Sequence, residues 1–254
     1  MPLKNNIVNL FYKIINYIGF DLIRIPFKTK RMNYDEIFKL KIKNKKPIIF
    51  DVGANEGQSI KRFKNIFPNS IIHSFEPNKN CYELLLKKYS NDKNIILNNL
   101  SCGEKIKKKK FLIMAKSGNS SFININKNSA WMKKRSEEIG IKKYIVKKPI
   151  VKMITLDSYI RKNNIKKIDI LKLDTQGNED KIIKGCQNSL KKIHFIEAEI
   201  MLDNVYKKFL NISDIEKKII KKKFRLVGIE HHGGFKNLFE GYMFVVDTLY
   251  MRTR

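Results

Sequence analysis

The stretch PIIFDVGANEGQS, Pro47 to Ser59, indicates the fold of this chain. An apolar run typical of a buried strand stops at Asp51, and two glycines, Gly53 and Gly57, follow four positions apart. A glycine-rich turn between a strand and a helix lets a ligand approach the main chain and lets the helix amides face that ligand. We therefore expect an α/β domain with a ligand site at the end of its first strand.

The bulk composition limits the choice of protein class. A chain of 254 residues with a hydrophobic fraction of 43% suits one globular α/β domain with a full core. The 53 Lys and Arg against 24 Asp and Glu leave a net charge of +29, which attracts phosphates, nucleic acid or an anionic membrane surface. Lys, Asn and Ile are abundant together, as AT-rich coding produces, so we favour composition drift as the larger cause of this charge.

The cysteines and the N-terminal region bear on location. Cys81, Cys102 and Cys186 lack C-x-x-C spacing, which argues against a disulfide scaffold or a zinc site and predicts a cytoplasmic protein. Residues 1–46 are predicted to form an amphipathic helix and a basic connector, and Lys13 interrupts the apolar region too early for a signal peptide. The apolar stripe of this helix either packs on the parent domain or contacts the inner membrane surface peripherally.

Residues 47–254 read as one domain in which strands and helices alternate, the pattern of a parallel sheet wrapped by helices. The predicted strands are 47–52, 70–77, 94–100, 166–174, 193–200, 224–229 and 241–246. The predicted helices are 57–67, 78–89 and 213–224, the last opened by a Ser213/Glu216 capping box. Residues 107–148 lose this rhythm and are polar and Lys-rich, so we expect a loop insertion that acts as a lid or substrate loop.

Details of the opening stretch and of the second strand narrow the ligand. Gly53 and Gly57 give G-x-x-x-G, so the G-x-G-x-x-G fingerprint of pyrophosphate binding is absent. Asp51 would repel a pyrophosphate but could hold a cationic group. Glu76 ends the second strand, where a carboxylate can accept hydrogen bonds from two ribose hydroxyls. A ligand with a ribose, no phosphate and a cationic amino-acid end is S-adenosylmethionine, which we predict as the cofactor.

Five motifs in this order, FDVGANEGQS, SFEP, TLDSYI, LKLDTQGNEDKIIKGC and IEAEI, resemble those of the FkbM-family methyltransferases. The resemblance runs from about Ile48 to Glu199, and GYMFVV is a family-like ending. It implies a Rossmann-like class I O-methyltransferase with a mostly parallel sheet of about seven strands, the last antiparallel, and helices on both faces. Such enzymes are often found with polysaccharide or natural-product pathways. The family more often shows a small residue and an Asp where this chain reads NNLSCGEK.

The cofactor-binding candidates are Asp51, Gly53, Ala54, Asn55, Gly57, Glu76, Pro77, Asn99 and Ser101. Methyl transfer to a hydroxyl requires an acceptor held close to the methyl donor and a base that takes the hydroxyl proton. Our candidates for that base are, in order, Asp174, Glu199 and His231. Asp174 ends a buried strand at the edge where ligands of α/β sheets bind, and Glu199 ends another strand at the same edge, where it could equally be solvated. His231 has the most suitable ordinary pKa but lies in a loop that the sequence does not place.

Candidates for acceptor binding are Gln176, Glu179, Ser120, Ser121 and Trp131. Each also has a structural interpretation: Glu179 as a helix cap, the serines as a turn, and Trp131 as an anchor of the loop. No spacing compels a metal site, so we expect none.

The sequence leaves three functions open. The first is methylation of a hydroxyl of a small or glycan-type acceptor, and the second is methylation of RNA. The third is a non-catalytic basic module that binds anionic membrane or glycan, against which the intact Asp51, Gly53, Gly57 and Glu76 count. The lysine clusters 107–110 and 221–223 lack the interleaved aromatic platforms of RNA enzymes, so nucleic acid is the less favoured partner.

Overall fold

The computed structural model of the chain describes residues 17, 32–126, 128–129, 144–202, 207, 212–231 and 245–253. The chain divides into two compact units, residues 1–40 and 41–254. Helix α2 (Tyr34–Lys41) forms within the stretch expected to be a basic connector, and it buries Tyr34 and Phe38. The amphipathic helix expected before it lies outside the described residues, and the division of the chain after residue 46 stays a prediction.

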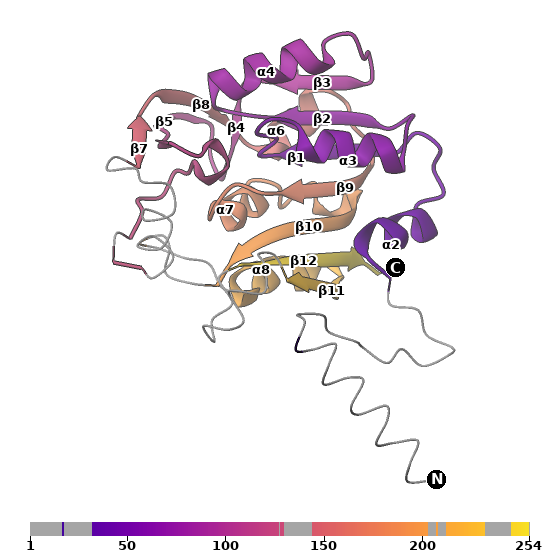
Figure 1. Cartoon of the computed structure of the whole chain (residues 1–254). Coiled ribbons are helices and arrows are strands. Elements are labelled where there is room, and N and C mark those ends of the chain that lie inside the picture. The colour runs from indigo at the N-terminus through magenta and orange to yellow at the C-terminus, as the bar shows by residue number, and fades with distance from the viewer. Residues whose placement is uncertain are drawn as a thin grey trace. The chain divides into compact units, whose positions relative to one another are not determined.

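The second unit is built on a seven-stranded sheet of order β11-β12-β10-β9-β1-β2-β3 (Figure 1). The strands are β1 (Ile48–Val52), β2 (Ile71–Phe75), β3 (Ile95–Asn98), β9 (Ile168–Leu173), β10 (Ile193–Met201), β11 (Phe224–His231) and β12 (Val245–Arg252). The neighbouring strands β3, β2, β1, β9 and β10 pair in parallel. Strand β12 runs antiparallel to both β10 and β11. The predicted Rossmann-like class I fold is therefore confirmed. The described part of the last strand, β12, runs from Val245 to Arg252, and residues 241–244 of the predicted strand lie outside the described residues.

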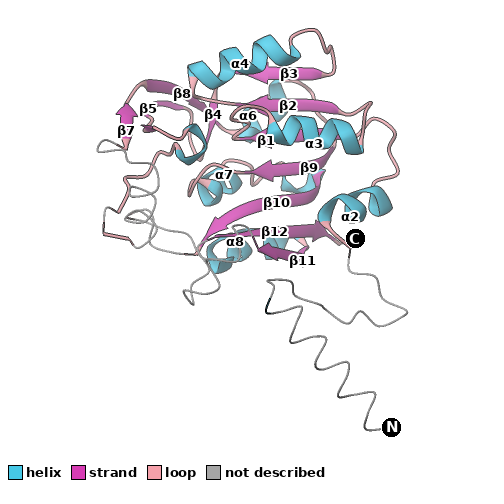
Figure 2. Ribbon diagram, viewed as in Figure 1, coloured by secondary structure: helices cyan, strands magenta, loops and turns pink. Residues whose placement is uncertain are grey.

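Helices cover both faces of this sheet (Figure 2). One face carries α3 (Gln58–Ile66) and α4 (Lys79–Tyr89), and the other carries α6 (Leu156–Lys162), α7 (Glu179–Lys184) and α8 (Ile212–Ile219). Sequence periodicity missed α6 because the helix is short; it is capped by Thr155, whose side chain accepts a hydrogen bond from the Ser158 N–H at 3.1 Å. Helix α8 spans Ile212–Ile219, so Ser213 lies inside the helix. The prediction that Ser213 is the N-cap of this helix is therefore wrong.

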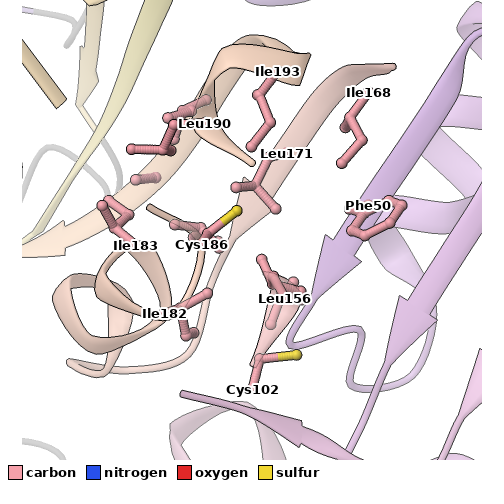
Figure 3. Close-up of a cluster of buried hydrophobic side chains, with 14 of the residues drawn as sticks. Phe50, Cys102, Leu156, Ile168, Leu171, Ile182, Ile183, Cys186, Leu190 and Ile193 are labelled. Atoms are coloured by element: carbon pink, nitrogen blue, oxygen red, sulfur yellow. The ribbon is translucent and has the colours of Figure 1, made fainter. Parts of the chain in front are cut away.

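The main core lies between the sheet and the α6–α8 layer (Figure 3). Phe50 and Leu171, from β1 and β9, belong to the same buried cluster as Leu156, Ile182 and Ile183 from the helices. The three cysteines are buried and unbridged. Because successive strand side chains point to opposite faces, the residues between these apolar ones, such as Asp51, face the α3 side.

The segment predicted as a loop insertion contains strands. A small sheet of order β4-β8-β5 joins β4 (Ser101–Cys102), β8 (Ile150–Ile154) and β5 (Lys107–Lys110), and a second pairs β6 (Ile113–Met114) with β7 (Ile145–Lys147). Lysine runs have little strand preference of their own, so pairing with β8 decides the structure of Lys107–Lys110. The expectation of an irregular loop over 107–148 is therefore wrong for β5, β6 and β7, whereas their partners β4 and β8 flank that segment. Across the described residues, no helix combines the length and apolarity required to cross a bilayer.

Candidate active site

A cavity of about 270 Å³ opens at the carboxyl ends of β1, β2 and β9. Six of the predicted cofactor-binding residues line it: Gly53, Ala54, Asn55, Glu76, Pro77 and Ser101. Asp174, Gln176 and Ser120 line it as well, so residues predicted for catalysis and for acceptor binding share the same space. The parallel strands bring these residues together because their carboxyl ends meet at one edge of the sheet.

The two glycines of the first turn serve packing. Gly53 has φ +93°, and a Cβ built on it would lie 1.8 Å from the carbonyl oxygen of Asp174. The turn after β1 can therefore pack this closely against the turn after β9 only if residue 53 is a glycine. Gly57 also has φ +93°, and its Cβ would lie 2.6 Å from the ring of Tyr89 on α4. Gly57 precedes α3 and is not among the residues that line the cavity.

Glu76 presents a buried carboxylate at the β2 end of the cavity, with 6% of the residue exposed. Its Oε2 accepts a hydrogen bond from the Asn55 N–H at 2.8 Å, and its Oε1 accepts one from the Asn78 N–H at 2.7 Å. Burial raises the pKa of Glu76 to about 7, although these two backbone donors oppose the shift. Each carboxylate oxygen has two lone pairs, so each can accept one further hydroxyl hydrogen. This arrangement fits a ribose diol.

Asn99 supports Glu76 from outside the cavity. Its Nδ2 donates to the backbone carbonyl of Glu76 at 2.8 Å, and the Asn99 side chain does not line the cavity.

Asp51 is fully buried in β1, beneath the cavity and not in its wall. Burial raises the pKa of Asp51 to about 6, and the Lys172 ammonium opposes this shift. The Ser59 hydroxyl lies near enough to lower the pKa slightly, yet within the described residues neither carboxylate oxygen has a partner of hydrogen-bonding geometry. A buried carboxylate without such a partner, below a cavity that Ser59 lines, fits a ligand with a cationic end.

A row of charged residues crosses the α3 face of the sheet. Asp51 pairs in register with Lys172, and Lys172 pairs in register with Glu197, on three adjacent strands. Arg62 of α3 closes the row with an ion pair to Glu197 Oε1 at 2.6 Å. Burial would lower the pKa of Lys172, but the carboxylates of Asp174, Asp51 and Glu197 raise it above its ordinary value. Lys172 is therefore charged at neutral pH.

Asp174 joins this row to the cavity. Its Oδ2 accepts from Lys172 Nζ at 2.9 Å, and its Oδ1 accepts from Gln176 Nε2 at 3.3 Å. The Asp174 side chain is 35% exposed, toward the cavity that it lines. Burial pulls the pKa of Asp174 upward, but the charge and hydrogen bond of Lys172, together with hydrogen bonds from Glu199 and Gln176, outweigh it and hold the pKa below its ordinary value. Asp174 is therefore an ionised carboxylate that faces the cavity.

The surroundings of Glu199 favour its protonated form, whereas those of Asp174 favour the ionised form. Its Oε2 accepts a hydrogen bond from Gln176 Nε2, and Glu199 does not line the cavity. Burial and, next, the negative charge of Asp174 raise the pKa of Glu199 well above its ordinary value. When the environments of two neighbouring carboxyl groups push their pKa values apart, the ionised one is suited to act as a base. The geometry thus favours Asp174 over Glu199 as a base.

The remaining predicted residues lie behind the cavity wall or beyond the described residues. Glu179 is buried and accepts hydrogen bonds from the Thr175 N–H at 2.7 Å and the Thr175 hydroxyl at 2.8 Å; burial raises its pKa to about 7. Ser121 donates to the Gln176 carbonyl at 2.7 Å. The backbone of His231 ends β11, but its side chain lies outside the described part, as does the whole of Trp131.

Sequence reasoning missed two parts of the site. The insertion supplies Phe111, Phe122, Ser117 and Gly118 to the cavity wall, and the Phe111 and Phe122 rings pack at 4.8 Å between centroids. The other part is Lys172, one of two charged residues, with Asp169, in the otherwise apolar strand β9. The two-residue spacing of Lys172 and Asp174 places both side chains on one face of the strand, and this spacing is the sequence signal that could have identified Lys172.

The described residues contain no group of three or more His, Cys, Asp or Glu side chains placed to hold a metal ion.

Comparisons with known proteins identify relatives. A sequence model described as the methyltransferase FkbM domain matches residues 51–226. "Methyltransferase sdnD" of Sordaria araneosa is 25% identical over 193 residues, which are 67% of this chain and 72% of that protein.

Two solved structures resemble the chain more distantly. A fibrillarin/Nop5p complex gives a TM-score of 0.43 at 12% identity, covering 86% of this chain and 79% of that one. M. capricolum TrmK, solved with S-adenosyl-homocysteine, gives a TM-score of 0.42 at 9% identity, covering 88% of this chain and 70% of that one.

Proposed function

The chain belongs to the FkbM methyltransferase family, and from this premise we propose that it methylates a hydroxyl group of a small or glycan-type acceptor. Membership makes the protein an S-adenosylmethionine-dependent methyltransferase. The acceptor and the atom that is methylated are the parts that we propose.

The cofactor supplies an electrophilic methyl group when it is bound. In our proposal the Glu76 carboxylate accepts hydrogen bonds from the ribose hydroxyls, and Asp51 attracts the cationic amino-acid end. Both assignments are supported by the spare lone pairs of Glu76 and by the absence of a hydrogen-bond partner for Asp51 within the described residues.

One observation carries the assignment to hydroxyl chemistry: the Asp174 carboxylate faces the cavity and is paired with the Lys172 ammonium at 2.9 Å, which favours its ionised form. A hydroxyl becomes a better nucleophile when a base takes its proton as the new oxygen–carbon bond forms. Asp174 accepts that proton on a carboxylate oxygen, and Lys172 and Gln176 hold the carboxylate in place. General-base catalysis of this kind contributes about 10²–10⁴-fold to the rate.

The cavity wall supports a small hydroxylated acceptor. Ser117, Ser120 and Gln176 supply polar groups to this wall, and these can form hydrogen bonds with hydroxyls such as those of a sugar. The acceptor group therefore enters a partly polar space next to Asp174.

The location of the protein remains a proposal from the sequence. We place the enzyme in the cytoplasm, with residues 1–46 in peripheral contact with anionic membrane at its inner surface. Flotation with anionic liposomes, for the full chain and for a chain without residues 1–30, tests this: loss of flotation in the shortened chain is expected, and equal flotation would contradict it.

The proposed reaction is tested with a methyl-labelled cofactor and fractionated extract of the source cells. Label in a hydroxylated small molecule or glycan, as a base-stable ether, is the expected result. Label recovered in RNA would contradict the proposal, and so would a product that forms equally well with the Asp174→Asn variant. Calorimetric titration with S-adenosylhomocysteine first establishes that each preparation binds the cofactor product.

A further inference from the structure

Lysines lead away from the cavity along one face of β5. Lys107 pairs with Met153 and Lys109 pairs with Val151 in the antiparallel register with β8. The ladder continues through the Phe111 N–H, which donates to the Pro149 carbonyl at 2.8 Å. Strand alternation therefore puts Lys107, Lys109 and Phe111 on one face, and Lys108 on the opposite face. Phe111 lines the cavity, so Lys109 is the next residue outward on that face.

An aromatic side chain of the cavity wall holds Lys109. The Lys109 ammonium lies 4.9 Å from the centroid of the Phe122 ring. Phe122 itself lines the cavity and packs on Phe111. A cation over an aromatic face is favourable and restricts the movement of a side chain that is otherwise flexible. Lys109 is thus held next to the cavity by one of its own wall residues.

Lys181 approaches the same place from α7. Asn178, immediately before this helix, lines the cavity, and Lys181 lies in the first turn that follows. Burial, and then the positive charges of Lys181 and Lys107, hold the pKa of Lys109 below its ordinary value. We call Lys107, Lys109 and Lys181 the rim lysines.

Neighbouring acids balance the positive charge of the rim lysines only in part. Glu104 is close enough to interact with Lys107 and Lys109, but its Oε2 is paired with Lys184 at 3.0 Å. In the described ranges of the chain, no ion pair within 4 Å involves a rim lysine. Like charges brought together without partners repel one another, and a bound anion relieves that repulsion.

We infer that the rim lysines bind a phosphate group of the acceptor, next to the cavity in which its hydroxyl is methylated. This inference rests on the proposed function and specifies its substrate class, namely a phosphorylated sugar or a sugar nucleotide. A phosphate offers several charged acceptor oxygens, and ammonium groups bind it through charge-assisted hydrogen bonds. The cofactor carries no phosphate, so a phosphate site beside this cavity serves the other substrate.

Pyrophosphate is the probe for this site. Its binding is measured by calorimetry at low, fixed ionic strength, with the enzyme saturated by S-adenosylhomocysteine. The wild-type chain is expected to bind pyrophosphate, and Lys109→Gln and Lys181→Gln are each expected to weaken binding by about tenfold. Lys108→Gln is the matched control, because it removes the same charge from the same strand but from the opposite face, and it should leave binding unchanged.

Other outcomes separate this inference from the proposed function. Equal weakening by Lys108→Gln, no pyrophosphate binding, or competition between pyrophosphate and S-adenosylhomocysteine would overturn the rim site. A failure of S-adenosylhomocysteine to bind would instead overturn the cofactor assignments of the proposed function. Displacement of pyrophosphate by glucose 1-phosphate or by UDP-glucose supports the inference and tells the two sources of phosphate apart. A single-stranded RNA that displaces pyrophosphate and is itself methylated would overturn the inference in favour of an RNA substrate.

Discussion

The Lys172 ammonium lies 2.9 Å from Asp174 Oδ2, and both side chains point to the same face of the sheet at the base of the cavity. Lys172 also pairs in register with Asp51 on one side and Glu197 on the other. One lysine therefore lies among three carboxylates and favours the ionised form of the cavity-facing one. This relationship makes Lys172 a positioning residue, since it acts through Asp174.

Loss of the Lys172 charge should change the pH dependence of activity. In Lys172→Gln the pKa of Asp174 rises, because burial then acts without a compensating cation. The acidic limb of the pH–rate profile is expected to move to higher pH, and Lys172→Arg is expected to keep it in place. Breaking a buried ion pair costs about 3–5 kcal/mol, so folding is checked by circular dichroism. An unmoved acidic limb in a folded Lys172→Gln variant would exclude this role.

Asp174 and Glu199 should respond differently to amide substitution. Asp174→Asn removes the base and is expected to lower turnover by about 10²–10⁴-fold while preserving the affinity for S-adenosylhomocysteine. Glu199→Gln replaces a protonated acid by a group of nearly the same shape, so turnover at neutral pH is expected to stay within a few-fold. Steady-state rates and calorimetric titration measure both effects. The reverse ranking of the two variants would make Glu199 the base.

Glu76 should make cofactor binding depend on pH. Its pKa of about 7 means that raising the pH ionises the carboxylate, and an ionised carboxylate accepts the ribose hydroxyl hydrogens better. The affinity for S-adenosylhomocysteine is therefore expected to rise as pH increases through about 7. Glu76→Ala should weaken it by several-fold to a hundredfold, through the loss of about 1.5–3 kcal/mol. Glu83→Gln, on the exposed surface of α4, is the control, and an affinity unaltered in Glu76→Ala would refute the ribose assignment.

Glu179 should make the fold less stable at alkaline pH. Its pKa is raised from an ordinary value of 4.5 to about 7, so the folded chain retains a proton that the unfolded chain releases. The contribution of Glu179 to the free energy of unfolding is complete below 4.5 and is lost as pH rises through about 7. Urea denaturation at pH 5 and pH 8 should show a smaller difference for Glu179→Gln than for the wild type. An identical difference would mean that Glu179 titrates normally in the folded state.

Gly53 and Gly57 form a matched pair for a packing test. Both have φ +93°, so substitution by alanine strains the backbone equally at the two sites, by about 1–2 kcal/mol. The new methyl group at Gly53 meets the backbone oxygen of Asp174, whereas at Gly57 it meets the Tyr89 side chain, which can move. Gly53→Ala is therefore expected to lower the melting temperature more than Gly57→Ala does. Equal losses would mean that the turn after β9 moves freely.

The sequence by itself determined the order of the strands and helices around the site and the positions of its main acidic residues. Short apolar runs that end in Asp51, Glu76 and Asp174, each followed by turn or helix signals, predict strands whose carboxyl ends meet. These features are local: hydrophobic period, glycine and the acidic residue at a strand end are readable within a dozen residues. The family motifs overlap the same positions.

The tertiary structure alone decided the electrostatics of the site and the structure of the insertion. The register that places Asp51 beside Lys172, and Lys172 beside Glu197, joins strands far apart in the chain, and no local pattern encodes it. The same applies to Lys107–Lys110, whose strand exists because β8 pairs with it. The raised pKa of Glu199 follows from burial and from the negative charge of Asp174, and the lowered pKa of Asp174 follows chiefly from the position of the Lys172 ammonium. Both depend on the folded arrangement and not on residue type.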